Sequence, residues 1–296
     1  METLLEQAFN GLSVGSILLL VAIGLTFTFG QMNVINMAHG ELIMIGAYTP
    51  YVLQHDFGLA AGLSILLGLF IAFIVAGGVG VAMERGLLSR MVDRPLDTLL
   101  VTFGVSLILQ QAARDIFGAP NVDVVAPSWL KGSVTLLGVI MPYTRLFIMA
   151  LVAVIVGGLS VFMARHAEGR RMRAVTQNRD LAAVSGLSPR RVDATTFFLG
   201  SGLAGVAGVA VSLIGSIGSQ VGSGYIIDAF LVVIVGGLGR MKGTIIAAFA
   251  LGMLNAYAEF WKNASIGKAI VFMAVIVFLQ FRPNGLVSFR TRGLTS

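Results

Sequence analysis

Nine apolar runs divide this 296-residue chain, and each approaches the length that a helix needs to cross a lipid bilayer. The hydrocarbon core of a bilayer requires about 20 consecutive apolar residues in a helix. We therefore predict an all-α integral membrane protein, a polytopic bundle of eight or nine transmembrane helices that forms a single domain over residues 1–296. The predicted spans are 9–29, 34–53, 59–83, 95–117, 146–164, 194–217, 225–239, 243–260 and 266–281.

The composition excludes an ordinary soluble domain. Hydrophobic residues make up 56% of the chain and charged residues 11%, whereas a soluble domain carries about a quarter charged residues. The 37 glycines are typical of membrane helices. Cysteine is absent, which excludes disulfide and thiolate chemistry. The N-terminus contains Glu2 and Glu6 but no basic residue, so we expect no cleaved signal peptide and a retained first span.

The distribution of Lys and Arg predicts the orientation in the membrane. The segment Arg165–Asp193 contains seven arginines between two apolar runs, and such basic loops are cytoplasmic by the positive-inside rule. This assignment makes Glu84–Arg94, Arg240–Gly243 and the tail from Arg282 cytoplasmic as well. These inner segments hold 15 of the 20 basic residues, so the N-terminus is expected outside and the C-terminus inside. The basic residues sort by membrane side, so the high isoelectric point does not indicate nucleic-acid binding.

The basic loop 165–193 also contains signals for local structure. Apolar and polar residues alternate around Val175–Ala183 in a way that suits a short amphipathic helix, which Gly186 would end. Ser188 and Pro189 are typical of the N-cap and first position of a following helix. The loop is therefore either a compact helical unit or an ordinary basic anchor at the lipid headgroups.

Small residues mark the sixth predicted span and the segment after it. Gly200, Ala204 and Gly208 lie at four-residue intervals, which predicts close helix packing, and Ser201 and Gly205 form a second such ridge. The glycine-rich segment that follows cannot continue a straight helix. It is either a surface turn or a broken, re-entrant segment near 215–228, and irregular backbone at membrane depth requires a protein or water-filled environment.

Three polar residues in or near the second span, Asn36, His39 and Glu41, and Asp228 in the seventh are candidates for a substrate pathway. Ionisable groups at membrane depth usually face a polar cavity or a partner. The pathway would then serve a polar solute. The alternative is that His39 and Glu41 lie at a membrane boundary and fix a helix end.

Signals for an enzyme are missing from the sequence. The histidines at 39, 55 and 166 are too scattered for a zinc pair on one helix, so we expect no metal site and no cofactor. The segment Gly236–Thr244 lacks the glycine directly before lysine that a phosphate-binding loop requires. Energy from ATP would therefore have to come through a partner.

Several long stretches resemble the permeases of branched-chain amino-acid ABC importers. They are NMAHGELIMIGAY (Asn36–Tyr48), Gly169–Gly208 and Ile234–Ala248. A further set is similar to the urea-importing branch in particular, namely Arg94–Gln111, Asn121–Leu130 and Arg173–Gly186. The resemblance implies a permease of a bacterial inner membrane with urea as the expected solute. A branched-chain amino acid or short amide is the alternative solute, and a secondary transporter or channel is the competing class.

The same resemblance implies partners and a coupling segment. The partners would be a second, similar permease, two ATPase subunits and an extracytoplasmic substrate-binding protein. ATP hydrolysis would take place on the ATPase subunits, so this chain itself is expected not to be an enzyme. The cytoplasmic coupling helix would lie at about Ala174–Gly186. The residues expected to couple to the ATPase are Arg173, Asn178, Arg179, Asp180, Ala182 and Gly186.

Overall fold

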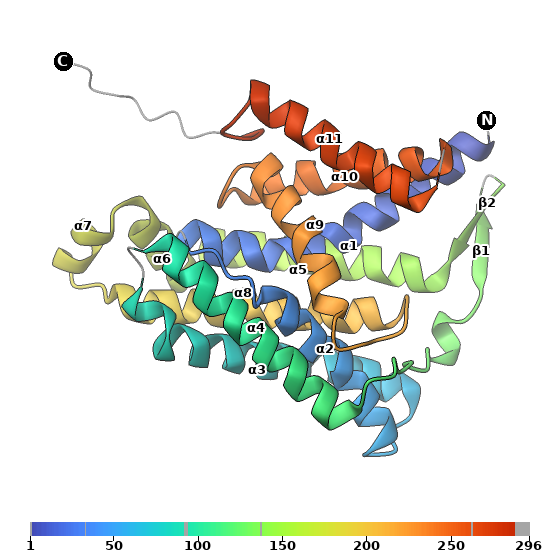
Figure 1. The fold of residues 1–296 in the computed structure, drawn as a ribbon, viewed down its shortest axis with the longest axis horizontal. Coiled ribbons are helices and arrows are strands. Elements are labelled where there is room, and N and C mark those ends of the chain that lie inside the picture. Colours follow the sequence, from blue (N-terminus) through green and yellow to red (C-terminus); the bar gives the residue numbers. More distant parts are fainter. Residues whose placement is uncertain (1, 33, 92–93, 137, 262, 288–296) are drawn as a thin grey trace.

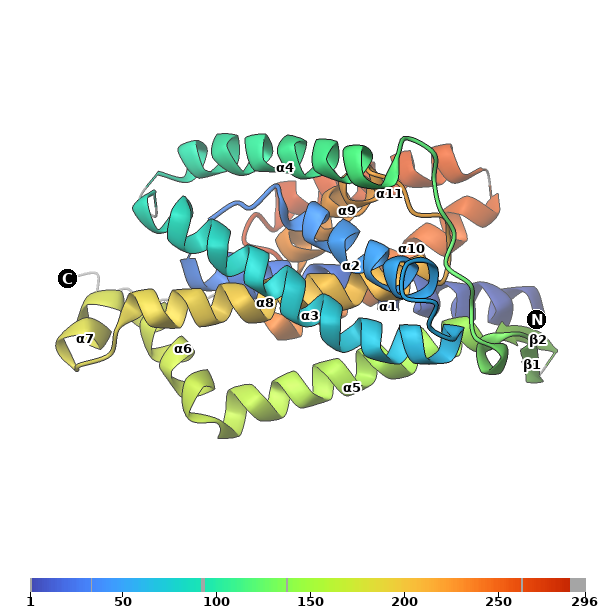
Figure 2. The ribbon, with the colours of Figure 1, turned by 90° about the horizontal axis from the view of Figure 1, so that it is seen from below.

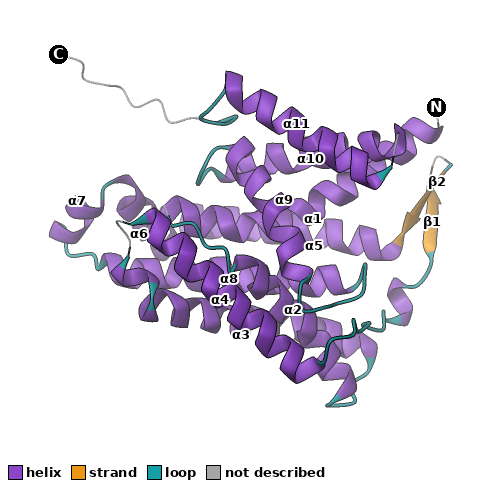
Figure 3. Ribbon diagram, viewed as in Figure 1, coloured by secondary structure: helices purple, strands orange, loops and turns teal. Residues whose placement is uncertain are grey.

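The computed structural model describes residues 2–32, 34–91, 94–136, 138–261 and 263–287, and these residues are mainly helical (Figures 1 and 3). The α-helices are α1 (Glu2–Met32), α2 (His39–His55), α3 (Ala61–Gly86), α4 (Pro95–Phe117), α5 (Tyr143–Arg165), α6 (Ala167–Gln177), α7 (Arg179–Val184), α8 (Pro189–Ser212), α9 (Val221–Gly236), α10 (Met241–Trp261) and α11 (Ala264–Phe281). Two 3-10 turns, Leu88–Arg90 and Ser128–Leu130, accompany them. An antiparallel ribbon of β1 (Ser133–Leu136) and β2 (Val139–Pro142) is a small exception to the all-α prediction.

Seven of these helices are long and apolar enough to cross a membrane: α1, α3, α4, α5, α8, α10 and α11. The shorter helices α2 and α9, with 17 and 16 residues, occupy the second and seventh predicted spans. The prediction of a polytopic helical bundle is confirmed, and the bounds of α4 agree with the predicted 95–117. The sixth span is shifted, because α8 begins at Pro189 and ends at Ser212 instead of covering 194–217.

Helix α8 lies at the centre of the bundle and packs against α1, α2 and α3. Its two predicted small-residue ridges are used for close packing. Gly200 lies against Gly24 of α1, where an added Cβ would be 2.7 Å from the Gly24 carbonyl oxygen. Gly208 meets the backbone of α2, and Gly205 meets the backbone of α3. Glycine ridges of this kind let helix backbones approach closely in the absence of water.

The outer helices leave much of their apolar surface uncovered. In Figure 2, α4 and α5 lie on opposite sides of the layer that contains α1 and α8. In the most apolar stretches of α5 and α11 only 17% of residues are buried, compared with 83% in α8. Large exposed apolar patches mark membrane or protein contacts, so the faces of these helices fit the hydrocarbon of a bilayer.

The two short helices begin opposite each other in the interior. Helix α2 follows a non-helical segment at 34–38, which ends in a turn, so the second predicted span becomes helical only at His39. Helix α9 follows a second non-helical segment at 213–220, in which Ile217 exchanges two 2.8 Å backbone hydrogen bonds with Val122. The backbones of Gly40 and Gly222 are in close contact. This arrangement fits the broken-helix alternative for 215–228 better than a surface turn.

The basic loop folds into two helices, where the sequence predicted one. Helix α6 ends at Gln177, and the Asn178 side chain accepts a 2.9 Å hydrogen bond from the Leu181 amide, which starts α7 as a new helix. An asparagine in this N-cap position satisfies an amide that the helix itself leaves unpaired. The predicted end at Gly186 is confirmed, since its φ is +84° and the Leu187 amide donates to the Ala182 carbonyl at 3.0 Å.

Candidate solute site at the interrupted helices

Glu41, in the first turn of α2, is the centre of a polar cluster inside the bundle. Its side chain is buried, and Oε1 accepts hydrogen bonds from Ser106 Oγ at 3.0 Å and Gln110 Nε2 at 2.9 Å. A third donor, the Ser223 hydroxyl, lies 3.4 Å from the same oxygen. The cluster therefore joins α2 to α4 and α9, which are separate in sequence. Burial of a carboxylate is costly unless it receives such hydrogen bonds.

Helix α4 contributes a stripe of polar side chains to this region. The stripe consists of Thr98, Thr102, Ser106 and Gln110, spaced four residues apart and therefore on one face of the helix. Thr102 Oγ1 accepts a 3.1 Å hydrogen bond from the Met37 amide, in the non-helical segment before α2. The stripe thus runs from that segment to Glu41. Our sequence analysis missed the stripe, although its four-residue spacing was a readable signal.

Several buried polar atoms of the interrupted segment lack a hydrogen-bond partner among the described residues. They are both amide atoms of Asn36, Nδ1 of His39 and Oε2 of Glu41. His39 Nε2 lies 3.2 Å from the Val21 carbonyl oxygen and so donates to it, which leaves Nδ1 as an acceptor. An unpaired buried polar group costs about 1–3 kcal/mol. These atoms could therefore bind a small molecule rich in hydrogen-bonding groups, or water.

Asp228 lies apart from this cluster. It is five residues after Ser223 on α9, so it is turned to another side of the helix. Its Oδ2 is 3.3 Å from Lys268 Nζ on α11, in an ion pair that is partly exposed. The structure therefore brings Asn36, His39 and Glu41 into one region and places Asp228 at the α9–α11 contact.

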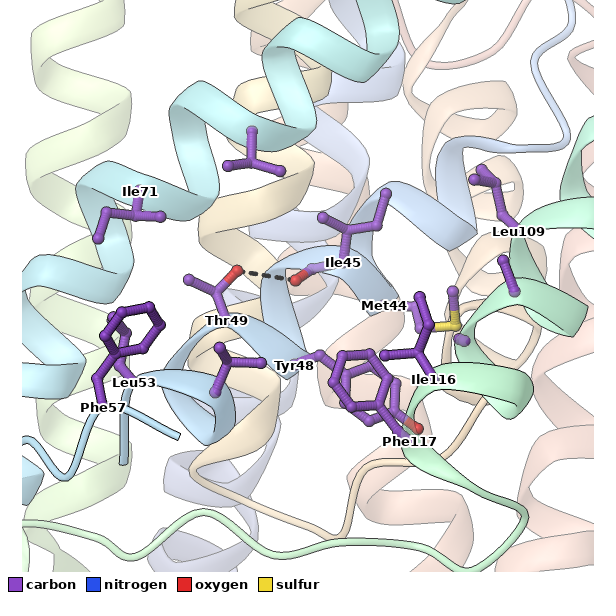
Figure 4. A pocket seen from close by; sticks show the side chains of 14 residues that line it. Met44, Ile45, Tyr48, Thr49, Leu53, Phe57, Ile71, Leu109, Ile116 and Phe117 are labelled. Atoms are coloured by element: carbon purple, nitrogen blue, oxygen red, sulfur yellow. Dashed lines mark hydrogen bonds between the residues drawn. The ribbon is translucent and has the colours of Figure 1, made fainter. Parts of the chain in front are cut away.

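An apolar cavity of about 440 Å³ lies beside the polar cluster, between α2, α3 and α4 (Figure 4). Met44 and Leu109, close to Glu41 and Gln110 in sequence, line it. At its far end, the rings of Tyr48 and Phe117 stack with centroids 4.0 Å apart. The Thr49 hydroxyl donates a 2.9 Å hydrogen bond to the Ile45 carbonyl. The cavity therefore offers an apolar surface next to the polar Glu41 cluster.

The predicted coupling residues have different surroundings in the folded loop. Arg179 forms a two-pronged ion pair with Asp193 of α8, whose side chain is only 2% exposed, with Nη2 to Oδ2 at 2.5 Å. Arg179 therefore fastens α7 to α8. Arg173 donates to the Met163 carbonyl, Asn178 caps α7, and Asp180 is exposed.

Ala182 is buried, which corrects the expectation that it forms an exposed docking face. It packs with Met172, Val175 and Val192 in a small core between α6, α7 and α8. Leu181 and Val184 instead project from α7, with 65% and 88% of their surface exposed. Nothing in the sequence indicated this, because which side of the segment is buried depends on its contacts with α6 and α8.

A second buried acid lies near the Arg179–Asp193 pair. Glu84, in the last turn of α3, is 1% exposed, and it lies within electrostatic range of both Asp193 and Arg179. The three residues come from α3, α8 and α7. Through them the basic loop is connected to the two helices that make the most extensive contact in the bundle.

Its long apolar helices and apolar exterior define this chain as a polytopic membrane protein. Comparison with protein families identifies it more closely, because residues 7–279 match the branched-chain amino acid transport system permease component family. The chain belongs to this family.

Individual relatives match along almost the whole chain. The high-affinity branched-chain amino acid transport system permease protein BraD of Pseudomonas aeruginosa is 30% identical over 96% of this chain and 95% of its own length. The LivH permease protein of Salmonella typhimurium is also 30% identical, with the same coverage. A probable LivH protein of Methanocaldococcus jannaschii is 25% identical over 92% of this chain and 88% of its own. No solved structure matches the chain significantly.

These matches establish a permease component of an ABC importer and a multi-pass membrane location. In such transporters ATP hydrolysis belongs to a separate subunit, so the chain is not itself an enzyme. The family assignment favours an ABC permease over the competing class, which was a self-sufficient carrier or channel. The urea branch expected from sequence motifs receives no support from these relatives, all of which are named for branched-chain amino acids.

Proposed function

We propose that this chain forms one half of the solute pathway of an ATP-driven importer, and that the solute passes the interruption before α2. The observation that supports the proposal best is the buried cluster around Glu41, where polar atoms remain without a protein partner. Ionisable groups inside a membrane protein are costly and usually serve a function. Asn36, His39 and Glu41 would contact the solute, with Ser106, Gln110 and Ser223 holding the carboxylate. Asp228 would shape the pathway from the α9–α11 side.

We further propose a branched-chain amino acid or a short amide as the solute. The named relatives support this class over urea. The site also combines the groups that such a solute needs. Glu41 could accept hydrogen bonds from an ammonium group, and the starts of α2 and α9 could face a carboxylate, as interrupted helices do in other transporters. The apolar cavity of about 440 Å³ beside Glu41 could receive an aliphatic side chain.

Urea remains the second candidate, because one observation favours it. The unpartnered acceptors include Nδ1 of His39 and Oε2 of Glu41, and the Asn36 amide can both donate and accept. A neutral planar molecule with four N–H groups and one carbonyl oxygen could satisfy them without an apolar pocket.

Uptake in cells that express the complete importer tests the function and separates the two solutes. Labelled leucine and labelled urea would be supplied separately, with ATP either intact or depleted while the ion gradient is maintained. We expect leucine uptake that stops when ATP is depleted. Uptake of urea alone would reverse the choice of solute, and uptake that persists without ATP would contradict the ATP-driven mechanism.

We also propose the partners and the orientation. The N-terminus would lie outside the bacterial inner membrane and the C-terminus in the cytoplasm, in agreement with the excess of basic residues at the cytoplasmic ends. A second permease would complete the pathway, two ATPase subunits would bind from the cytoplasm, and a substrate-binding protein would deliver the solute from outside. The exposed Leu181 and Val184 on α7 form an apolar tip that fits a groove on an ATPase subunit. Gly186 would keep this tip in place by ending α7.

The ATPase cycle would then act on the pathway through α7. Binding of the ATPase subunit would move α7, and the Arg179–Asp193 ion pair would transmit this movement to α8. Glu84 of α3 lies close to this ion pair. A ligand or partner shifts a conformational equilibrium only as far as it binds the two states differently. The ATP-bound and ATP-free ATPases would therefore need to hold α7 in two positions.

A further inference from the structure

A second and larger cavity, of about 970 Å³, lies at the C-terminal end of α1, and no residue of the Glu41 cluster lines it. The last turns of α1 and α5 contribute to it, together with α6 and the start of α10. The last turn of α5, helix α6 and the start of α10 carry basic residues that predict the cytoplasmic side, whereas the last turn of α1 has none. The cavity therefore lies at the level where the headgroups of the inner leaflet meet the protein.

The charged groups that line this cavity are all cations. They are Arg173 on α6, Arg240 before α10 and Lys242 in the first turn of α10, and no carboxylate lies among the lining residues. Helix α10 also has no acidic residue in its first turn. The N-terminal end of a helix carries a partial positive charge, so a lysine there is unfavourable unless an anion is nearby.

A polar amide also lines the cavity. Gln31, in the last turn of α1, is partly exposed, and its Oε1 lies 2.5 Å from Thr176 Oγ1, a hydroxyl that also lies 2.9 Å from the Met172 carbonyl oxygen. The Nε2 atom of Gln31 is buried with no partner among the described residues. Nε2 can only donate, so the missing partner is an acceptor. Burial also lowers the pKa of the Arg240 guanidinium from its ordinary value. An anion bound beside it would raise this pKa again.

The other part of the lining is apolar. Phe27, Met163, Ala164 and Met172 contribute carbon surface from α1, α5 and α6. A ligand that fits both parts carries an anionic group at one end and hydrocarbon at the other. Basic pockets between membrane helices on the cytoplasmic side are known to receive lipid headgroups of this kind.

We propose that this cavity binds one anionic phospholipid of the inner leaflet. Its phosphate lies against Arg240, Lys242 and the Gln31 amide, and its acyl chains run along α1 and α5. Because Arg173 belongs to α6, the lipid connects the cytoplasmic loop with the start of α10. The site makes no use of the proposed solute or of the ATPase, so it can be tested independently of both.

The test measures lipid binding to the purified full-length chain in detergent. Phosphatidylglycerol, phosphatidylcholine and inorganic phosphate are added separately, with retained lipid detected by native mass spectrometry and stability by the thermal unfolding midpoint. We expect phosphatidylglycerol to be retained and to raise the midpoint, while phosphatidylcholine and inorganic phosphate have little effect. Arg240→Gln combined with Lys242→Gln should weaken phosphatidylglycerol binding by about tenfold or more.

A matched control separates the site from general charge attraction. Arg170→Gln combined with Arg171→Gln also removes two cations from this side, but both residues are exposed on α6 and neither lines the cavity. The control should bind phosphatidylglycerol as the native chain does. An equal loss in the control, or equal binding of phosphatidylcholine, would refute the proposal. An equal effect of inorganic phosphate would identify a free-anion site and refute the lipid.

A single substitution covers the case in which the double variant does not fold. Lys242 is exposed in the described structure, so Lys242→Gln should give a chain that elutes normally on gel filtration. We expect this variant to bind phosphatidylglycerol about threefold less tightly. Unchanged binding in a folded Lys242→Gln chain would count against the site.

Discussion

Glu41 presents its two carboxylate oxygens to different surroundings. Oε1 receives hydrogen bonds from α4 and α9, whereas Oε2 is buried without a partner among the described residues. A side chain needed only for structure would be expected to have both oxygens satisfied. We propose that one oxygen holds the cluster together and that the other is available to a passing solute.

We expect Glu41→Gln to reduce uptake by about tenfold, or roughly 1.4 kcal/mol in activation free energy, with little loss of folded protein. The glutamine amide keeps the shape of the side chain and one oxygen that can accept from Ser106 and Gln110. It removes the negative charge and puts an NH₂ group in place of one carboxylate oxygen. Uptake per amount of purified importer is the measurement. Glu6→Gln, at an exposed position of α1, is the control. Full uptake by Glu41→Gln would leave Glu41 with a structural role only.

Asp193 is the second acid whose surroundings define its role. It is almost fully buried and depends on Arg179 for its charge partner, although Arg179 itself is 39% exposed. We expect Arg179→Gln to destabilise the chain by about 1–3 kcal/mol, since it leaves a buried acceptor without its partner. Thermal unfolding of the purified chain measures the effect. Asp180→Asn, at an exposed neighbouring position, should change stability much less, and equal effects would argue against the ion pair.

At the scale of elements, α7 is a short helix whose two sides have separate roles. Ala182 faces the core between α6 and α8, and Leu181 and Val184 face outward. The sequence predicted the end of α7 at Gly186 and the start of α8 at Pro189 correctly, because both residues act on their immediate neighbours, but it missed the start of α7 after Asn178. It could not predict which side faces inward, since that depends on contacts with Val192 and the residues of α6.

We expect Val184→Asp combined with Leu181→Asp to prevent the ATPase subunits from co-purifying while the permease stays folded. The substitutions place charges on an exposed apolar tip and disturb no internal contact. Ala182→Trp should instead lower the unfolding temperature, because overpacking a small core costs about 1–3 kcal/mol. Gly186→Val should also destabilise α7, since its φ of +84° is unfavourable for a branched residue. Co-purification that survives both Asp substitutions would exclude this tip as the docking surface.

The starts of α2 and α9 show a different limit of sequence reasoning. The glycine-rich sequence indicated a surface turn or a broken segment near 215–228, and the chain is non-helical at 213–220. The meeting of the two helix starts could not be predicted, because Glu41 and Ser223 are 182 residues apart in sequence. The position of Asp228 could not be predicted either. It is an acid in a predicted span, as Glu41 is, but its side chain pairs with Lys268.

At the scale of the whole molecule, the helices divide into a buried centre and a lipid-facing periphery. Helix length and apolarity were sufficient to predict the spans, because each span carries its own signal, but they do not separate central from peripheral helices, since α1 and α11 are similarly apolar and differ widely in burial. The orientation of the bundle depends instead on the 15 of 20 basic residues assigned to one side.

We expect labelling of single introduced cysteines to confirm the orientation. The native chain has no cysteine, so substitutions of Glu6, Ser128, Ser188 and Thr295 can be labelled one at a time. An impermeant reagent added outside intact cells should reach the first two positions only; Thr295 lies outside the described residues. Labelling in permeabilised cells serves as the control, and labelling of Ser188 from outside would invert the arrangement.

The glycine contacts of α8 have a mechanical consequence. Where backbone meets backbone, as at Gly24 and Gly200, there is no long side chain to bend or change rotamer when the helices slide. Such a contact is stiff, and it tends to move as one piece. Helices α1, α2, α3 and α8 should therefore behave as a rigid frame during the transport cycle. Helix α4, attached through polar side chains and separated from α3 by a cavity, is the part free to swing.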